Sequence, residues 1–110
     1  MIISSKNNIT IIKQEKDSIN ELAQELSKSV EKFSSDNIII NLITQNEVKP
    51  SDVLDFFEFS NNHRESQHSL VIVNNSIDLD EIADELVVVP TLQEAFDIIE
   101  MEEMERDLGF

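Results

Sequence analysis

The sequence contains no cysteine, which excludes a disulfide framework, a thiolate metal cage and a cysteine nucleophile. Its one glycine is Gly109, so the chain has no glycine-rich loop that could hold a phosphate and no G-x-S-x-G turn. No uninterrupted apolar run is longer than four residues, whereas a transmembrane helix needs about 20. No basic segment followed by an apolar stretch opens the chain, so we expect no secretory signal and a cytoplasmic protein.

Positive charge is scarce in the last third of the chain. The formal net charge is −15, and residues 78–110 hold 12 of the 23 acidic residues against a single base, Arg106. Binding to phosphate backbones or to anionic lipid needs clustered Lys and Arg, so we expect neither nucleic-acid nor membrane binding. Two interpretations stay open for the acidic surface: one that keeps a small protein soluble, and one that docks a basic protein partner.

The 110 residues, 40% of them apolar, suffice for a single domain over 1–110, with an acidic C-terminal helix or tail over 91–110. Residues 2–5 and 9–13 predict a hairpin whose turn uses asparagine, which tolerates left-handed backbone angles. A capping box at Ser18–Glu21 predicts the start of a helix. Behind it, apolar residues at helical spacing predict one buried stripe, formed by Ile19, Leu22, Ala23, Leu26, Val30 and Phe33.

Three short segments, Asn37–Ile43, Leu70–Val73 and Leu86–Val89, are apolar without alternation, which is typical of strands covered on both faces in a parallel sheet. Between the first two, Pro50 suits the first position of a helix that extends to about Asn62.

A further short helix is expected over 78–84, and a capping box at Thr91–Glu94 predicts the last helix. The resulting order is ββαβαβαβα. It predicts an α/β fold with one mixed, mainly parallel sheet, an N-terminal hairpin and four helices.

Residues that could carry chemistry are present, but their spacing does not favour it. His63 and His68 are five residues apart, whereas zinc on one helix face needs ligands at i and i+4, so we predict a surface turn there. Paired carboxylates such as Glu102/Glu103 are expected on solvated helix faces, because acid–base catalysis needs a carboxyl with a raised pKa in a pocket. We therefore predict no enzymatic activity, no metal site and no cofactor.

The order of these segments resembles the STAS domain, the family that includes bacterial anti-sigma factor antagonists. The resemblance rests on a covered strand, a loop leading to a helix start, a second strand, and a last strand followed by a capped helix: Ile38–Leu42, Lys49–Leu54, Leu70–Val73 and Leu86–Ala95. It implies a regulatory module that binds another protein, such as a kinase-like anti-sigma factor, and no catalysis.

The resemblance also implies a candidate phosphoacceptor, Ser51, which falls near the family's phosphorylated Ser/Thr. Asn41 takes the place of the family's strand aspartate. The sequence departs from the family at Lys49, where the family has Asp, and at Asp52, where it has Gly. Two further interpretations stay open. Ser51 is a small polar residue suited to a first helical turn, and Asp52 supplies a permanent negative charge that locks the site instead of switching it.

The chain also resembles short bacterial proteins that carry the label ribonuclease Z. Those nucleases hold a zinc pair with an H-x-H-x-D-H motif, which this sequence lacks. The alternative function is therefore a small accessory subunit or partner of another enzyme, for example an RNA-processing nuclease, without a metal site of its own.

The expected protein-binding surface combines the loop after the central strand with the outer face of the second helix. Five apolar residues between Val53 and Phe59 exceed what one buried stripe needs, so either an aromatic is exposed as an anchor or the whole wide face is buried. The partner-binding candidates are Thr44, Gln45, Asn46, Lys49, Ser51, Asp52, Asp55, Phe56 and Phe59.

The segment Met101–Phe110 places Met101, Met104, Leu108 and Phe110 at a roughly helical spacing among acidic residues. Three outcomes are open for it: it packs back on the domain, it frays, or it binds a partner.

Overall fold

Five strands and several helices form the part of the chain that the computed structural model describes, residues 2–13, 19–28, 35–43, 48–76 and 86–109. In chain order the elements are β1 (Ile2–Lys6), β2 (Ile9–Lys13), α1 (Ile19–Lys28), β3 (Asn37–Asn41), α2 (Pro50–Val53), the 3₁₀ turn η2 (Leu54–Phe56), α3 (Phe57–Glu65), β4 (Leu70–Val73), β5 (Val88–Val89) and α4 (Leu92–Asp107).

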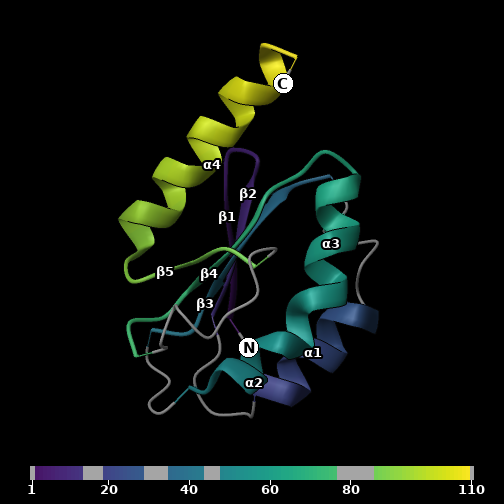
Figure 1. Ribbon diagram of the computed structural model, residues 1–110, viewed down its shortest axis with the longest axis vertical. Helices are drawn as coiled ribbons and strands as arrows, with labels where there is room; N and C mark the ends of the chain where they lie inside the picture. Colours follow the sequence, from purple (N-terminus) through teal and green to yellow (C-terminus); the bar gives the residue numbers. More distant parts are fainter. Residues whose placement is uncertain (1, 14–18, 29–34, 44–47, 77–85, 110) are drawn as a thin grey trace.

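The sheet has the order β1-β2-β3-β4-β5. Only β1 and β2 pair antiparallel, and β2 through β5 run parallel. Figure 1 shows α1, α2 and α3 on one face of this sheet and α4 on the other. The predicted α/β class and the mixed, mainly parallel sheet with its N-terminal hairpin are confirmed. The predicted helix over 78–84 lies outside the described residues, as do Ser18, Val30 and Phe33.

The hairpin turn uses asparagine as expected. Asn7 has a backbone φ of +57°, a left-handed conformation that asparagine adopts at lower cost than most residues. Lys6 pairs with Ile9 across this turn, and the pairing continues to Ile2 opposite Lys13.

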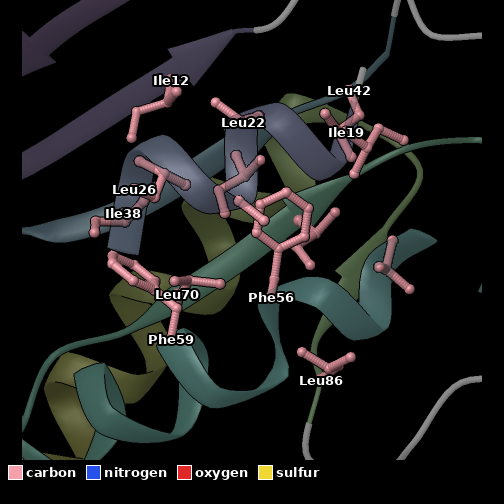
Figure 2. Close-up of a cluster of buried hydrophobic side chains, with 14 of the residues drawn as sticks. Ile12, Ile19, Leu22, Leu26, Ile38, Leu42, Phe56, Phe59, Leu70 and Leu86 are labelled. Carbon is pink, nitrogen blue, oxygen red and sulfur yellow. The ribbon is translucent and has the colours of Figure 1, made fainter. Parts of the chain in front are cut away.

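Two of the three uniformly apolar segments form strands covered on both faces, β3 and β4, whereas the predicted strand Leu86–Val89 shortens to the two-residue β5, in which Val88 is half-buried. On β3, Ile38 and Ile40 belong to the core beneath α1, α2 and α3, whereas Ile39 belongs to the core beneath α4. Leu70 and Ile72 of β4 alternate with Val71 and Val73 in the same way. Figure 2 shows the larger core, in which side chains of α1, η2 and α3 meet those of the strands.

The segment after Pro50 differs from the single α-helix predicted to Asn62. It begins as α2, tightens into η2 and resumes as α3, which ends at Glu65. Phe56 and Phe59 are both buried in the larger core. The apolar side chain left in water is Leu54, which is 51% exposed. The excess of apolar residues thus does expose one of them, but the residue is not an aromatic.

The final helix continues past residue 101 to Asp107. Thr91 caps it, since its Oγ1 accepts a hydrogen bond from the Glu94 N–H at 3.1 Å. Ala95 and Ile99 are buried against β3, β4 and β5. The C-terminal segment is a docked helix through Asp107 and does not fray there, but Met101, Met104 and Leu108 are exposed, so the partner-binding outcome stays open. Phe110 lies outside the described residues.

Candidate functional site

The carboxyl ends of β3 and β4 are fixed by asparagine side chains. Asn41 Oδ1 accepts a hydrogen bond from the Ile43 N–H at 3.0 Å, which turns the chain as it leaves β3. The buried Asn74 donates from Nδ2 to the Leu42 carbonyl at 2.9 Å and accepts from the Ser76 N–H at 2.9 Å. These contacts tie the end of β4 to the end of β3 at the edge of the sheet from which the chain proceeds to α2.

The start of α2 is held between two buried anchors. Val48, just before it, and Val53, at its end, both belong to the larger core. Between them the Lys49 N–H donates to Asp52 Oδ2 at 3.0 Å, and the Asp52 N–H donates to the Lys49 carbonyl at 2.9 Å. The first of these bonds is the Asp half of a capping box, and it gives the Lys49 N–H, which has no acceptor within the helix, a hydrogen-bond partner.

Several predicted partner-binding residues meet at this helix start. Lys49, Ser51 and Asp55 are exposed, and Asp52 is half-buried. Together with the exposed Leu54 they form what we call the α2 surface: Lys49, Ser51, Asp52, Leu54 and Asp55. Thr44, Gln45 and Asn46 lie outside the described residues.

The aromatic candidates do not belong to the α2 surface. Phe56 and Phe59 pack into the larger core, so the prediction that they contact a partner is wrong. The physical reason is the number of elements above this face of the sheet, because α1 and the strands together require a wide apolar surface from η2 and α3.

A shallow groove adjoins the α2 surface. It has a volume of about 380 Å³ and is lined by Asn20, Ala23, Gln24, Lys28 and Asp55. Asn20 Nδ2 donates to Asp55 Oδ2 at 3.1 Å, so α1 and η2 are bridged across one side of it. The exposed Leu54 is thus the sequence neighbour of Asp55, which lines this groove together with Lys28.

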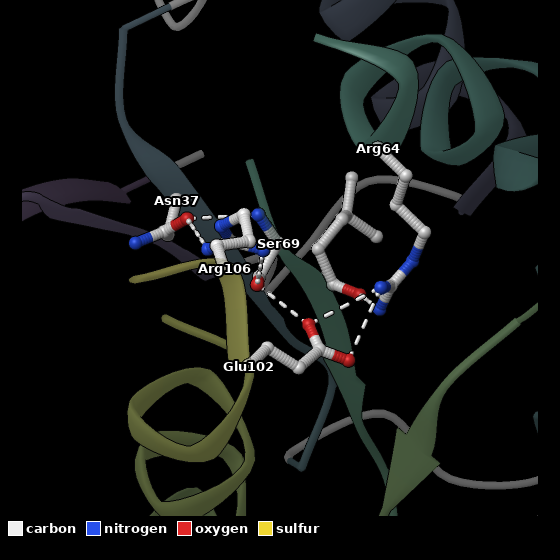
Figure 3. Close-up of polar contacts among 6 residues, drawn as sticks. Asn37, Arg64, Ser69, Glu102 and Arg106 are labelled. Carbon is white, nitrogen blue, oxygen red and sulfur yellow. Dashed lines mark hydrogen bonds and ion pairs between the residues drawn. The ribbon is translucent and has the colours of Figure 1, made fainter. Parts of the chain in front are cut away.

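A second polar cluster, which no sequence pattern predicts, occupies the opposite edge of the sheet. Arg64 of α3 donates from Nη1 to both carboxylate oxygens of Glu102 at 3.1 Å. Ser69 Oγ donates to Glu102 Oε1 at 2.5 Å and accepts from Arg106 Nη1 at 3.2 Å. Figure 3 shows Glu102 lying between Ser69 and Arg64, with Asn37 beside Arg106.

Asn37 joins this cluster to the sheet. Its Oδ1 accepts from the buried Ser69 N–H at 2.8 Å and from Arg106 Nη2 at 3.4 Å, and its Nδ2 donates to Glu103. Asn8, in the hairpin turn, also donates to Glu103. The Glu102/Glu103 pair is therefore not the solvated helix face that was expected, since both carboxylates anchor α4 to the strands.

His63 also differs from the prediction of a surface turn. It lies within α3 and is buried. Its ring stacks on Phe59 with centroids 6.0 Å apart, and its centroid is 5.4 Å from that of His68. The Asp36 carbonyl can only accept a hydrogen bond, so His63 Nε2, 2.6 Å away, carries the proton of the neutral ring.

Burial lowers the pKa of His63 below its usual value of 6.5, and the neighbouring His68 and Arg64 act in the same direction. The hydrogen bond to Asp36 opposes them without reversing the pKa shift. The folded chain thus favours neutral His63, whereas the unfolded chain takes up a proton there at the ordinary pKa.

Stability should therefore fall as the pH drops through about 6.5, because the unfolded state then binds a proton that the folded state resists. Replacing His63 by Gln should make this fall smaller. Urea unfolding of both proteins at about pH 7.5 and pH 5.5 measures it, with Asn62→Ala, an exposed residue of the same helix that does not titrate, as the control. An equal pH dependence in the His63→Gln variant and the unaltered protein would contradict the assignment.

Within the described ranges, no group of three or more His, Asp or Glu side chains could hold a metal ion. No helix in the same ranges is long and apolar enough to cross a membrane.

The described residues define an α/β protein with a mixed five-stranded sheet and two polar edges. No protein-family model matches the chain, and a search of curated proteins finds no match either. The resemblance to the STAS domain stays a prediction.

Proposed function

We propose that this chain is a non-catalytic regulatory module that binds another protein through the α2 surface. The observation that carries the proposal is the exposed Leu54, because every other apolar residue from Val53 to Phe59 is buried or half-buried. A partner that covers Leu54 would find charged side chains around it, which is the arrangement of an apolar centre with a polar rim that protein interfaces have.

Buried residues on either side of the start of α2 hold the surface around Leu54 in place, which suits it to docking. Val48 and Val53 are buried on either side of the helix start, so a partner meets a surface that is already ordered. Less conformational entropy is then lost on binding. The surface carries both signs of charge, with Lys49 opposite in sign to Asp52 and Asp55, which sets the orientation of a partner better than a surface of one sign.

The partner class follows from the predicted STAS resemblance, which implies a kinase-like anti-sigma factor. Ser51 is exposed and so within reach of such a kinase. Asp52 already places a carboxylate in the same helical turn, hydrogen-bonded to the Lys49 N–H. A phosphate on Ser51 would add about −1.5 to −2 charges beside it. We therefore propose the locked form of the site, which binds its partner without being phosphorylated.

Affinity capture from the native host tests the binding role. The unaltered chain should retain a partner. Combining Leu54→Ser with Asp55→Lys should lower the amount of partner recovered at least about tenfold, as expected for the removal of an anchor. Ile3→Ser is the matched control, because Ile3 is 46% exposed on the edge strand β1. Equal recovery by the double variant would refute the proposal.

Intact-mass measurement tests the locked form. The chain is incubated with the captured partner, or with any kinase recovered with it, and ATP. No mass increase is expected. A gain of one phosphate that disappears in the Ser51→Ala variant would contradict the locked form while leaving the binding role in place.

A further inference from the structure

The outward side of α4 carries an apolar stripe that the fold does not use. Met101, Met104 and Leu108 are 53%, 57% and 72% exposed. Their spacing of three and four residues places them on one line along the helix. Glu94 and Asp97 continue the same line toward the start of α4. We call this line the α4 outer face: Glu94, Asp97, Met101, Met104 and Leu108.

The opposite side of the same helix is firmly held. Glu102 and Arg106 bind Arg64, Ser69 and Asn37 at the edge of the sheet, and Ala95 and Ile99 pack into the smaller core. The helix is therefore docked by its polar residues in its second half, while the large apolar residues of that half point to water. Figure 1 shows this half of α4 extending along the end of the molecule that carries the β1–β2 turn.

Charge decides which occupant suits this face. The helix α4 contains seven acidic residues and one base, Arg106, a net charge of −6. Glu100 and Glu105 are exposed beside the apolar stripe. A second copy of the chain would bring an equally acidic helix against it, and like charges at close approach oppose association. A positively charged partner meets no such penalty.

We propose that the α4 outer face binds a basic amphipathic helix of another protein. The apolar side of that helix would cover Met101, Met104 and Leu108, and its Lys or Arg residues would pair with Glu100, Glu105 and Asp97. Unbranched methionine side chains adapt to different apolar partners, which suits such a contact. The mode is that of an amphipathic helix recognised through anchors at i, i+3 and i+7.

This site is independent of the proposed function, because α4 and the α2 surface lie on opposite faces of the sheet. The two proposals can therefore fail separately.

The test uses a synthetic peptide of leucine and lysine, about five helical turns long, with all leucines on one face. A peptide of the same composition in scrambled order, which has no apolar face, is the control ligand. Binding to the full chain is followed by fluorescence anisotropy at about 0.15 M salt. Combining Met101→Ser, Met104→Ser and Leu108→Ser should weaken binding of the ordered peptide at least about tenfold.

Two comparisons sharpen the result. Combining Glu100→Lys with Glu105→Lys should also weaken binding and flatten its salt dependence, because it removes the charge pairs. Leu54→Ser, a matched loss of one exposed apolar residue on the other face, should leave affinity within about twofold.

Three outcomes would overturn the proposal. The ordered peptide fails to bind or binds no better than the scrambled one, the triple variant binds as tightly as the unaltered chain, or sedimentation shows a dimer that the triple variant disperses. The last result would assign the face to a second copy of the chain.

Discussion

Replacing Phe56 by Ala should lower the free energy of unfolding by about 3–5 kcal/mol, the usual cost of truncating a buried aromatic. Phe56 is 1% exposed and lies in the larger core between α1 and the sheet. The truncation leaves a cavity that α1, η2 and the strands would have to collapse together to fill. Urea unfolding measures the change.

The matched control is two positions away in the chain. Leu54→Ala removes an apolar side chain that is mostly in water, so its effect should stay within about 0.5 kcal/mol. Similar losses for the two variants would mean that η2 does not turn Leu54 outward and Phe56 inward. The α2 surface would then lose its anchor.

Replacing Asn37 by Ala should cost about 1–3 kcal/mol, the penalty for leaving a buried donor without its acceptor. Asn37 Oδ1 is the acceptor for the buried Ser69 N–H, and the Asn37 amide also contacts Arg106 and Glu103 of α4. Because the variant loosens the second half of α4 from the sheet, amide exchange in residues 101–107 should also become faster.

Asn62→Ala is the control for this variant, since Asn62 is exposed on α3 and its truncation should change stability by less than about 0.5 kcal/mol. If Asn37→Ala proved as harmless as this control, the polar cluster of Asn37, Ser69, Glu102 and Arg106 would not be what holds α4.

The central strands β3 and β4 were predictable from the sequence because each carries its own signal. Ile38, Ile39 and Ile40 leave no polar face, and a strand without a polar face must be covered on both sides. The hairpin and the Thr91 cap were predictable for the same reason, since asparagine turns and capping threonines act over a few residues.

The rotation of the second helical segment was not predictable. The 3₁₀ turn at Leu54–Phe56 changes the angular step from one residue to the next. A single regular helix from Pro50 therefore cannot give the orientation of the residues that follow, Phe59 and His63 among them. The number of apolar residues led us to expect either an exposed aromatic or a wholly buried face, and the turn instead exposes Leu54.

The polar cluster at the other edge was not predictable because its members are distant in sequence. Asn37 lies on β3, Ser69 just before β4 and Arg106 on α4, and their contact depends on the register of β3 with β4 and on the length of α4. One signal was present. Arg106 is the single base among 12 acidic residues in 78–110, which marks it as a candidate for a specific contact.

Photo-crosslinking tests most directly that a partner docks at the α2 surface. The photoreactive amino acid p-benzoylphenylalanine is placed in the native host at position 54, and in a second strain at position 3, where an exposed apolar residue also stands. If the partner docks at the α2 surface, position 54 should give one discrete, light-dependent adduct of higher mass and position 3 should give none. An adduct from position 3 alone, or none from either position while the partner is still captured, would contradict docking at that surface.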